Sequence, residues 1–144
     1  MDRMHHFGIY GLWRHEGHLV LVHKTRGPYT GQLDLPGGSP EPGETREQRL
    51  SRELREETGV ELTGFGPLRP FDIRVSADSA GNPIEFHHQG LIAEVRVAGL
   101  LRPDITAEDV DGVALGGADT AERLSSLAME TLRLFPAYGP PTGG

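Results

Sequence analysis

The stretch from Gly38 to Val60, GSPEPGETREQRLSRELREETGV, restricts the fold more than any other part of the chain. Glycine and proline are frequent in its first part and exclude regular structure there, whereas neither interrupts residues 46–57. Thr45, followed three residues later by Gln48, is a capping-box pattern that starts a helix, and Gly59 suits a left-handed helix end. The stretch therefore predicts a loop, a helix over residues 46–57 and a second loop.

The predicted helix carries an acidic arc beside an apolar face. Leu50 and Leu54 share one face, and Glu53, Glu56 and Glu57 fall on the adjoining arc, since positions three and four apart are neighbours on a helix. A solvated acidic face is one interpretation. Carboxylates in the last turn, however, face the negative end of the helix dipole and repel one another. A binding site for a divalent cation would explain why the carboxylates are clustered. Oxygen ligands without Cys or His favour Mg²⁺ or Mn²⁺ over Zn²⁺.

The spacing of these residues resembles the Nudix box of the MutT-like Nudix hydrolases. The matching positions are Gly38, Glu44, Arg52, Glu53, the aliphatic Leu54, Glu56, Glu57, Gly59 and the aliphatic Val60. The resemblance implies an α+β fold in which a mixed β-sheet is sandwiched between helices (α/β/α). It also implies metal-dependent hydrolysis of a phosphoanhydride bond, but it does not identify the substrate.

The resemblance implies roles for individual residues. Glu53, Glu56, Glu57 and the Gly38 carbonyl would bind the metal. Arg52 would pair with Glu44 and orient these ligands. The general base varies within the family, so it is either Glu53 or a carboxylate from a distant loop. Glu108 is our first candidate in that loop and Asp109 the second, with solvated loop carboxylates as the alternative.

Length and composition indicate one domain. The 144 residues, 36% of them hydrophobic, suffice for one core, which we assign to residues 1–136, with a disordered tail over residues 137–144. The chain shows no membrane-spanning run, no signal-peptide pattern and no Cys, so we expect a soluble cytoplasmic protein. A net charge of -7 argues against a nucleic-acid polymer as partner and requires a metal beside any diphosphate.

Hydrophobic alternation and turn residues predict the remaining elements. The expected strands cover residues 7–13, 18–24 and 33–35, a short strand with a bend in 61–73, and strands over 72–76 and 84–97; residues 103–117 are expected to form a loop and 119–134 an amphipathic helix.

Several residues outside the box are candidates for substrate binding. Arg26, Tyr29 and Gln32 lie in a loop that often contacts substrate in the family, although they are equally consistent with plain loop residues. Phe86 and His88, with the adjacent His87, are candidates to stack on a base or bind phosphate, and the alternative is ordinary strand residues.

Together these features predict a Nudix pyrophosphohydrolase acting on a small-molecule nucleotide. Candidate substrates are nucleoside triphosphates, nucleotide sugars such as ADP-ribose, and dinucleoside polyphosphates. The alternative is a Nudix-fold module that senses a nucleotide without hydrolysing it. Proteins that resemble this chain are often dimers, so a homodimer is an open expectation.

Overall fold

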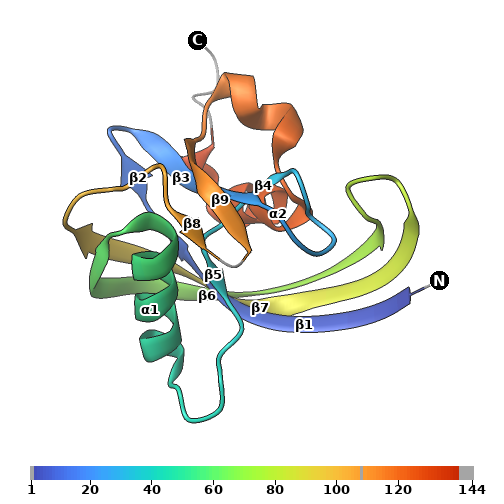
Figure 1. Ribbon diagram of the computed structural model, residues 1–144, viewed down its shortest axis with the longest axis horizontal. Helices are drawn as coiled ribbons and strands as arrows, with labels where there is room; N and C mark the ends of the chain where they lie inside the picture. The colour runs from blue at the N-terminus through green and yellow to red at the C-terminus, as the bar shows by residue number, and fades with distance from the viewer. Residues whose placement is uncertain (1, 108, 140–144) are drawn as a thin grey trace.

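The computed structural model describes residues 2–107 and 109–139, and its architecture is dominated by a long, curved, mixed β-sheet (Figure 1). Its strand order is β5-β1-β7-β6, formed by Gly37–Gly38, Asp2–Leu12, Pro83–Ala98 and Glu61–Ala77. Strand β1 pairs with β7 in parallel, whereas the β1–β5 and β6–β7 pairs are antiparallel. The predicted α+β class with a mixed sheet is confirmed.

A second, antiparallel sheet lies above the long one in Figure 1. It contains β2 (Arg14–His15), β3 (His18–Lys24), β9 (Val110–Leu115) and β8 (Thr106–Ala107) in that order, and β4 (Leu33–Asp34) pairs with β3. The predicted loop over residues 103–117 is therefore wrong, because it contains β8 and β9. The alternation of Val110, Gly112 and Ala114 was too weak to reveal a strand, which only pairing with β3 makes evident.

Helix α1 (Arg46–Thr58) forms as predicted. The Thr45 side chain accepts a hydrogen bond from the Gln48 backbone N–H, and the Gln48 side chain accepts one from the Thr45 backbone N–H. Gly59 adopts a left-handed conformation with φ of 83°. The apolar face of α1 is fully buried: Leu50 and Leu54 pack with Ile9, Trp13, Val20 and Val60 in one of two core clusters. The helix contacts β1, β5 and β6 of the long sheet and β8 and β9 of the other.

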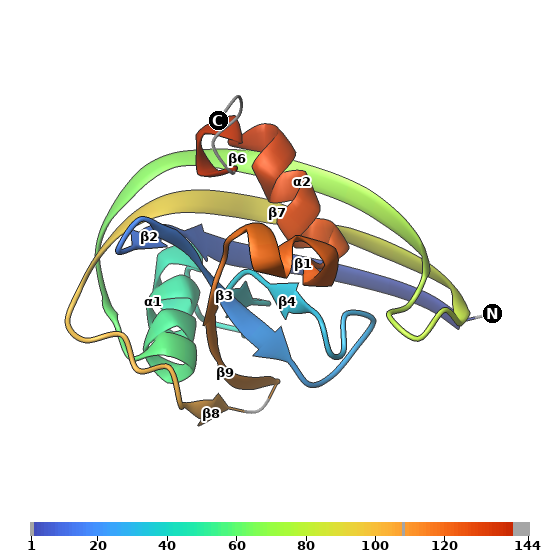
Figure 2. The same ribbon diagram turned by 90° about the horizontal axis from the view of Figure 1, so that it is seen from above.

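The C-terminal helical region differs from the prediction. A 3-10 helix, η1, covers Ala118–Arg123, and α2 covers Ser126–Leu134, so the predicted helix over 119–134 is interrupted. The interruption arises because Ser125 caps α2 with its side chain and Leu124 is extended. Helix α2 crosses β6, as Figure 2 shows.

The chain end also departs from the expected tail. A further 3-10 helix, η2, covers Pro136–Tyr138, and the Tyr138 ring packs against Phe135 and the Arg14 guanidinium. Ordered structure thus extends past residue 136, and residues 140–144 lie outside the described part of the chain.

Strand β6 replaces the predicted short strand, bend and second strand. It runs without a break along β7, and register shifts near Gly64 and between Phe65 and Leu68 absorb the irregular residues. Because β6 is an edge strand, Pro67 and Pro70 need no ladder partner on their outer side.

The parallel β1–β7 pair brings two glycines together. Gly8 lies opposite Gly90, whose φ is 153°, and a Cβ on Gly90 would overlap the backbone of Gly8. A side chain at this point is therefore incompatible with the observed strand spacing. Among the described residues, no helix is both long and apolar enough to cross a membrane.

Candidate functional site

The acidic arc of α1 lines a cavity of about 240 Å³. Glu53 and Glu57 are buried, with 9% and 5% of their surfaces exposed, whereas the side chain of Glu56 is half exposed. Strand β5 forms another wall, so Gly37 and Gly38 face the same space. The three glutamates and Gly38, predicted to act together, are thus gathered around one cavity.

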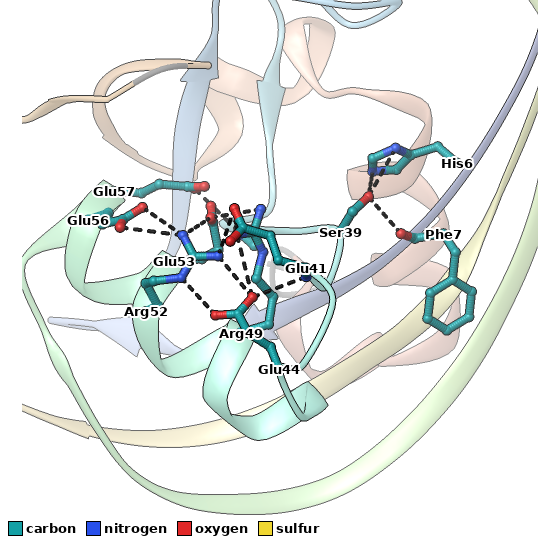
Figure 3. Close-up of polar contacts among 11 residues, drawn as sticks. His6, Phe7, Ser39, Glu41, Glu44, Arg49, Arg52, Glu53, Glu56 and Glu57 are labelled. Carbon is teal, nitrogen blue, oxygen red and sulfur yellow. Dashed lines mark hydrogen bonds and ion pairs between the residues drawn. The ribbon is translucent and has the colours of Figure 1, made fainter.

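Two arginines lie among these carboxylates (Figure 3). Arg52 binds Glu44 through two hydrogen bonds, Nε to Oε2 at 2.8 Å and Nη2 to Oε1 at 2.9 Å, which confirms the predicted pair. Its Nη1 also lies 3.5 Å from Glu53 and 3.4 Å from Glu56. Arg49, which was not among the predicted site residues, places Nη2 3.0 Å from Glu53. Both arginines therefore tie the loop before α1 to the acidic arc.

Burial changes the acidity of the glutamates. It raises the pKa of Glu57 well above the usual range and also raises the pKa of Glu53, and the two carboxyl groups hydrogen-bond each other. The backbone N–H of Gly37 donates to Glu57 at 3.3 Å and favours its charged form. Arg52, in contrast, lowers the pKa of Glu44. Glu53 and Glu57 are therefore harder to ionise than exposed glutamates, and positive charge brought into the cavity would oppose these shifts.

The donor set fits a hard divalent cation. All three glutamates offer carboxylate oxygens, and a Cβ at Gly38 would lie 3.5 Å from the Glu53 carboxyl carbon, so the backbone there is close to the ligands. As the side chains stand in residues 2–107 and 109–139, no three acidic or His groups are arranged to hold a metal. Arg49 and Arg52 occupy part of the carboxylate oxygens, and the Arg49 Nε is buried with no hydrogen-bond partner among the described atoms. A cation that bound to these carboxylates would have to displace the guanidinium groups from them.

A second cavity, of about 330 Å³, adjoins the first. His6, Tyr10, Lys24 and Asp109 line both cavities, so the two spaces meet at these side chains. The remaining wall of the second cavity is aromatic and polar, formed by Met4, His5, Arg26, Gly27, Pro28, Tyr29, Asp34, Phe86 and His88. A ligand with a ring at one end and phosphates at the other matches this pair of cavities.

His88 lies at the back of the second cavity and is 2% exposed. Its Nε2 and Nδ1 each lie 2.8 Å from a hydroxyl, those of Tyr10 and Tyr29. The ring stacks on Phe86, with centroids 5.1 Å apart. Because both nitrogens are engaged, His88 has no free nitrogen for a phosphate, and the structure instead gives it a role in positioning the two tyrosines. His87 points to the other face of β7 and binds Asp72.

The buried His88 gives a testable pH dependence. Burial lowers its pKa from 6.5 to about 3, so between these values the unfolded chain binds a proton that the folded chain does not. Stability is therefore lost as pH falls below 6.5, by about 1.4 kcal/mol per pH unit from this group. We expect His88→Gln to lose less stability than the wild type between pH 7 and pH 5, by about 2 kcal/mol, in urea unfolding at both pH values. Equal losses would contradict this assignment, and His15→Gln on the surface hairpin is the matched control.

The other predicted site residues differ in whether they line a cavity. Arg26, Tyr29 and Phe86 line the second cavity, whereas Gln32 is not among the residues described as lining either cavity. Asp109 lies where the cavities meet, with one oxygen 3.9 Å from Arg26. Glu108, our first candidate for a loop base, lies outside the described residues.

Other lining residues were missed by sequence reasoning. His6, Tyr10, Lys24 and Asp34 come from β1, β3 and β4, and only strand pairing brings them together. Lys24 and Asp34 had one available signal, because each is a charged residue at the end of an apolar strand.

Comparison with known proteins agrees with this geometry. The model of the NUDIX domain family matches residues 2–128, and the chain belongs to that family. Among curated proteins, a nucleoside triphosphatase NudI from Enterobacter sp. (strain 638) is 48% identical over 66 residues, which cover 44% of this chain and 47% of that protein. The chain thus spans about half the length of the curated relatives it matches.

Solved structures show the same fold. A MutT NUDIX hydrolase from Burkholderia pseudomallei superposes with a TM-score of 0.65 at 22% identity, covering 90% of this chain and 96% of that one. A bifunctional NMN adenylyltransferase/ADP ribose pyrophosphatase from Francisella tularensis, complexed with AMP and a Mn ion, gives a TM-score of 0.61 at 21% identity. It covers 94% of this chain and 42% of that one.

Proposed function

We propose that this protein hydrolyses a phosphoanhydride bond in a nucleoside diphosphate linked to a further group, with Mg²⁺ or Mn²⁺ as cofactor. One observation carries the proposal: a carboxylate-lined cavity and an aromatic-walled cavity meet at His6, Tyr10, Lys24 and Asp109. A nucleoside triphosphate is the first candidate, because the curated relatives are named nucleoside triphosphatases. Nucleotide sugars, including ADP-ribose, and dinucleoside polyphosphates are the further candidate substrates.

Binding divides between the two cavities in this proposal. The nucleoside occupies the second cavity against Tyr29 and Phe86, and the phosphates extend past Lys24 toward α1. Glu53, Glu56, Glu57 and the Gly38 carbonyl would hold the cation. When bound, the cation neutralises phosphate oxygens and makes a nearby water more acidic.

The chain's own groups supply orientation and proton transfer. Arg52, fixed by its two bonds to Glu44, aims the glutamates, and Lys24 offsets negative charge on the phosphates. A carboxylate oxygen takes the proton of the attacking water, whose oxygen bonds to one phosphorus while the bridging P–O bond breaks. Glu53 is the candidate base on α1; Asp109 and Glu108 are the candidates from the distal segment.

A substrate panel tests the proposed function. Purified protein is incubated with Mg²⁺ and each of the nucleoside triphosphates, ADP-ribose and a dinucleoside polyphosphate, and the products are separated chromatographically. Release of a nucleoside monophosphate with its phosphate-containing partner supports hydrolysis. Tight binding without product in the whole panel would instead support the alternative, a nucleotide sensor.

Metal binding has its own readout. We expect millimolar Mg²⁺ or Mn²⁺ to raise Tm, because a ligand that binds only the folded chain stabilises it by about 2.7 kcal/mol at 100 times its Kd. The measurement is differential scanning fluorimetry with and without metal at constant ionic strength. The double variant Glu53→Gln, Glu56→Gln should lose the shift, and no shift in the wild type would count against the metal site.

A further inference from the structure

Asp34 is a buried carboxylate in the wall of the second cavity that the proposed chemistry does not use. Only 2% of its surface is exposed, and its neighbours Leu33 and Leu35 belong to the apolar core. It lies on β4, away from the acidic arc, and lines the second cavity but not the first. A charged group in such a place is costly unless its acceptor positions are used.

The start of α2 fixes this carboxylate. The Ser125 hydroxyl donates to Asp34 Oδ1 at 2.6 Å and itself accepts the Ala128 N–H at 3.0 Å. The Ser125 backbone N–H donates to the Leu33 carbonyl at 2.8 Å, so Ser125 is bonded to the strand at Leu33 as well as at Asp34. Asp34 is therefore held in one orientation before any ligand arrives.

Acceptor capacity remains after these contacts. An ionised carboxylate offers about four lone-pair positions, and the Ser125 hydroxyl and Leu35 backbone N–H account for two. Burial raises the Asp34 pKa, while Lys24 and these two donors act against that rise. A ligand that brings N–H donors into the cavity would complete the set.

We propose that Asp34 determines base specificity by accepting hydrogen bonds from the pairing edge of the nucleobase, so that bases carrying an amino group are preferred. This inference rests on the proposed function for the placement of the nucleoside. Cytosine and guanine present amino hydrogens to an acceptor. Uracil carries a carbonyl oxygen where cytosine has its amino group, and hypoxanthine lacks the 2-amino group of guanine, so each leaves the carboxylate without that donor.

Two pairs of substrates, CTP with UTP and GTP with ITP, make a matched test, because the members of each pair differ in one amino group of the base. We expect wild-type kcat/KM to be about tenfold or more higher for CTP than for UTP and for GTP than for ITP, since a hydrogen bond to a charged group is worth about one to two decades of affinity. Asp34→Asn keeps an acceptor for Ser125 but presents an amide that can also donate, so both ratios should fall toward one. Asp72→Asn, on an exposed strand position, is the control and should leave both ratios unchanged.

Binding without turnover separates this inference from the proposed function. Titration calorimetry with CMP and UMP, and with GMP and IMP, reports the base preference even if no substrate is hydrolysed. A preference for CMP and GMP that Asp34→Asn removes supports the inference with or without catalysis. Equal wild-type affinities and equal kcat/KM values within each pair, or ratios unchanged in Asp34→Asn, would overturn it while leaving hydrolysis intact.

Discussion

Glu57→Gln is expected to lower turnover about 10²- to 10⁴-fold, because it removes one of the proposed metal ligands, without reducing the stability of the metal-free protein. Glu57 is buried beside Glu53, and burial together with the neighbouring Glu53 carboxyl raises the cost of ionising Glu57. Glutamine keeps an oxygen for the Gly37 N–H but carries no charge to desolvate. The measurements are steady-state hydrolysis with Mg²⁺ and urea unfolding without metal.

Glu61→Gln is the matched control for Glu57→Gln. Glu61 pairs with Arg55 on the surface, outside both cavities, so turnover should stay within a factor of two or so of wild type. Full turnover in Glu57→Gln would remove Glu57 from the mechanism. A large loss of metal-free stability would contradict the cost assigned to its burial.

Gly90→Ala is expected to destabilise the fold by about 3 kcal/mol or more. The new Cβ would overlap the Gly8 backbone, and the φ of 153° is one that side-chain-bearing residues rarely adopt. Strand β1 would have to move away from β7, and β1 also holds β5 at the carboxylate cavity. Chemical denaturation at constant pH measures the change.

Gly81→Ala separates backbone strain from steric overlap. Gly81 also has a positive φ, 86°, but nothing lies within 4 Å of a Cβ built there. Its alanine variant should cost only about 1 to 2 kcal/mol. If the two variants were equally stable, close approach of β1 and β7 would not be the reason for glycine at position 90.

The sequence predicted α1 well because the signals that define it are local. The Thr45–Gln48 box starts the helix, Gly59 ends it, and Leu50 and Leu54 fix its buried face. The acidic arc followed from the same periodicity. Residues three and four apart share a helix face in any protein, so their convergence needed no knowledge of the rest of the fold.

Strand pairing was less predictable because its partners are distant in the chain. Strands β8 and β9 were expected to be loop, since acidic residues and Gly112 interrupt their apolar pattern and only pairing of β9 with β3 and β8 completes the ladder. Strand β6 was divided in the prediction because its glycines and prolines signal breaks, whereas in the fold bulges against β7 accommodate them.

The second cavity could not be assembled from spacing. His6 comes from β1, Lys24 from β3, Asp34 from β4 and Phe86 from β7, and no interval between them recurs in a motif. The loop residues Arg26 and Tyr29 were proposed from the family resemblance, and they line it. The residues of a site on one helix can thus be predicted from a single sequence, whereas the residues of a pocket formed by several strands cannot.

The guanidinium groups of Arg49 and Arg52 act as counterions for Glu53 and Glu56 of α1. These two glutamates therefore have counterions within the chain itself. In small zinc domains the ion is part of the core, and its loss unfolds the protein. For the proposed metal site this predicts a chain that stays folded without its cation, so that removal of the cation would stop hydrolysis without unfolding the protein.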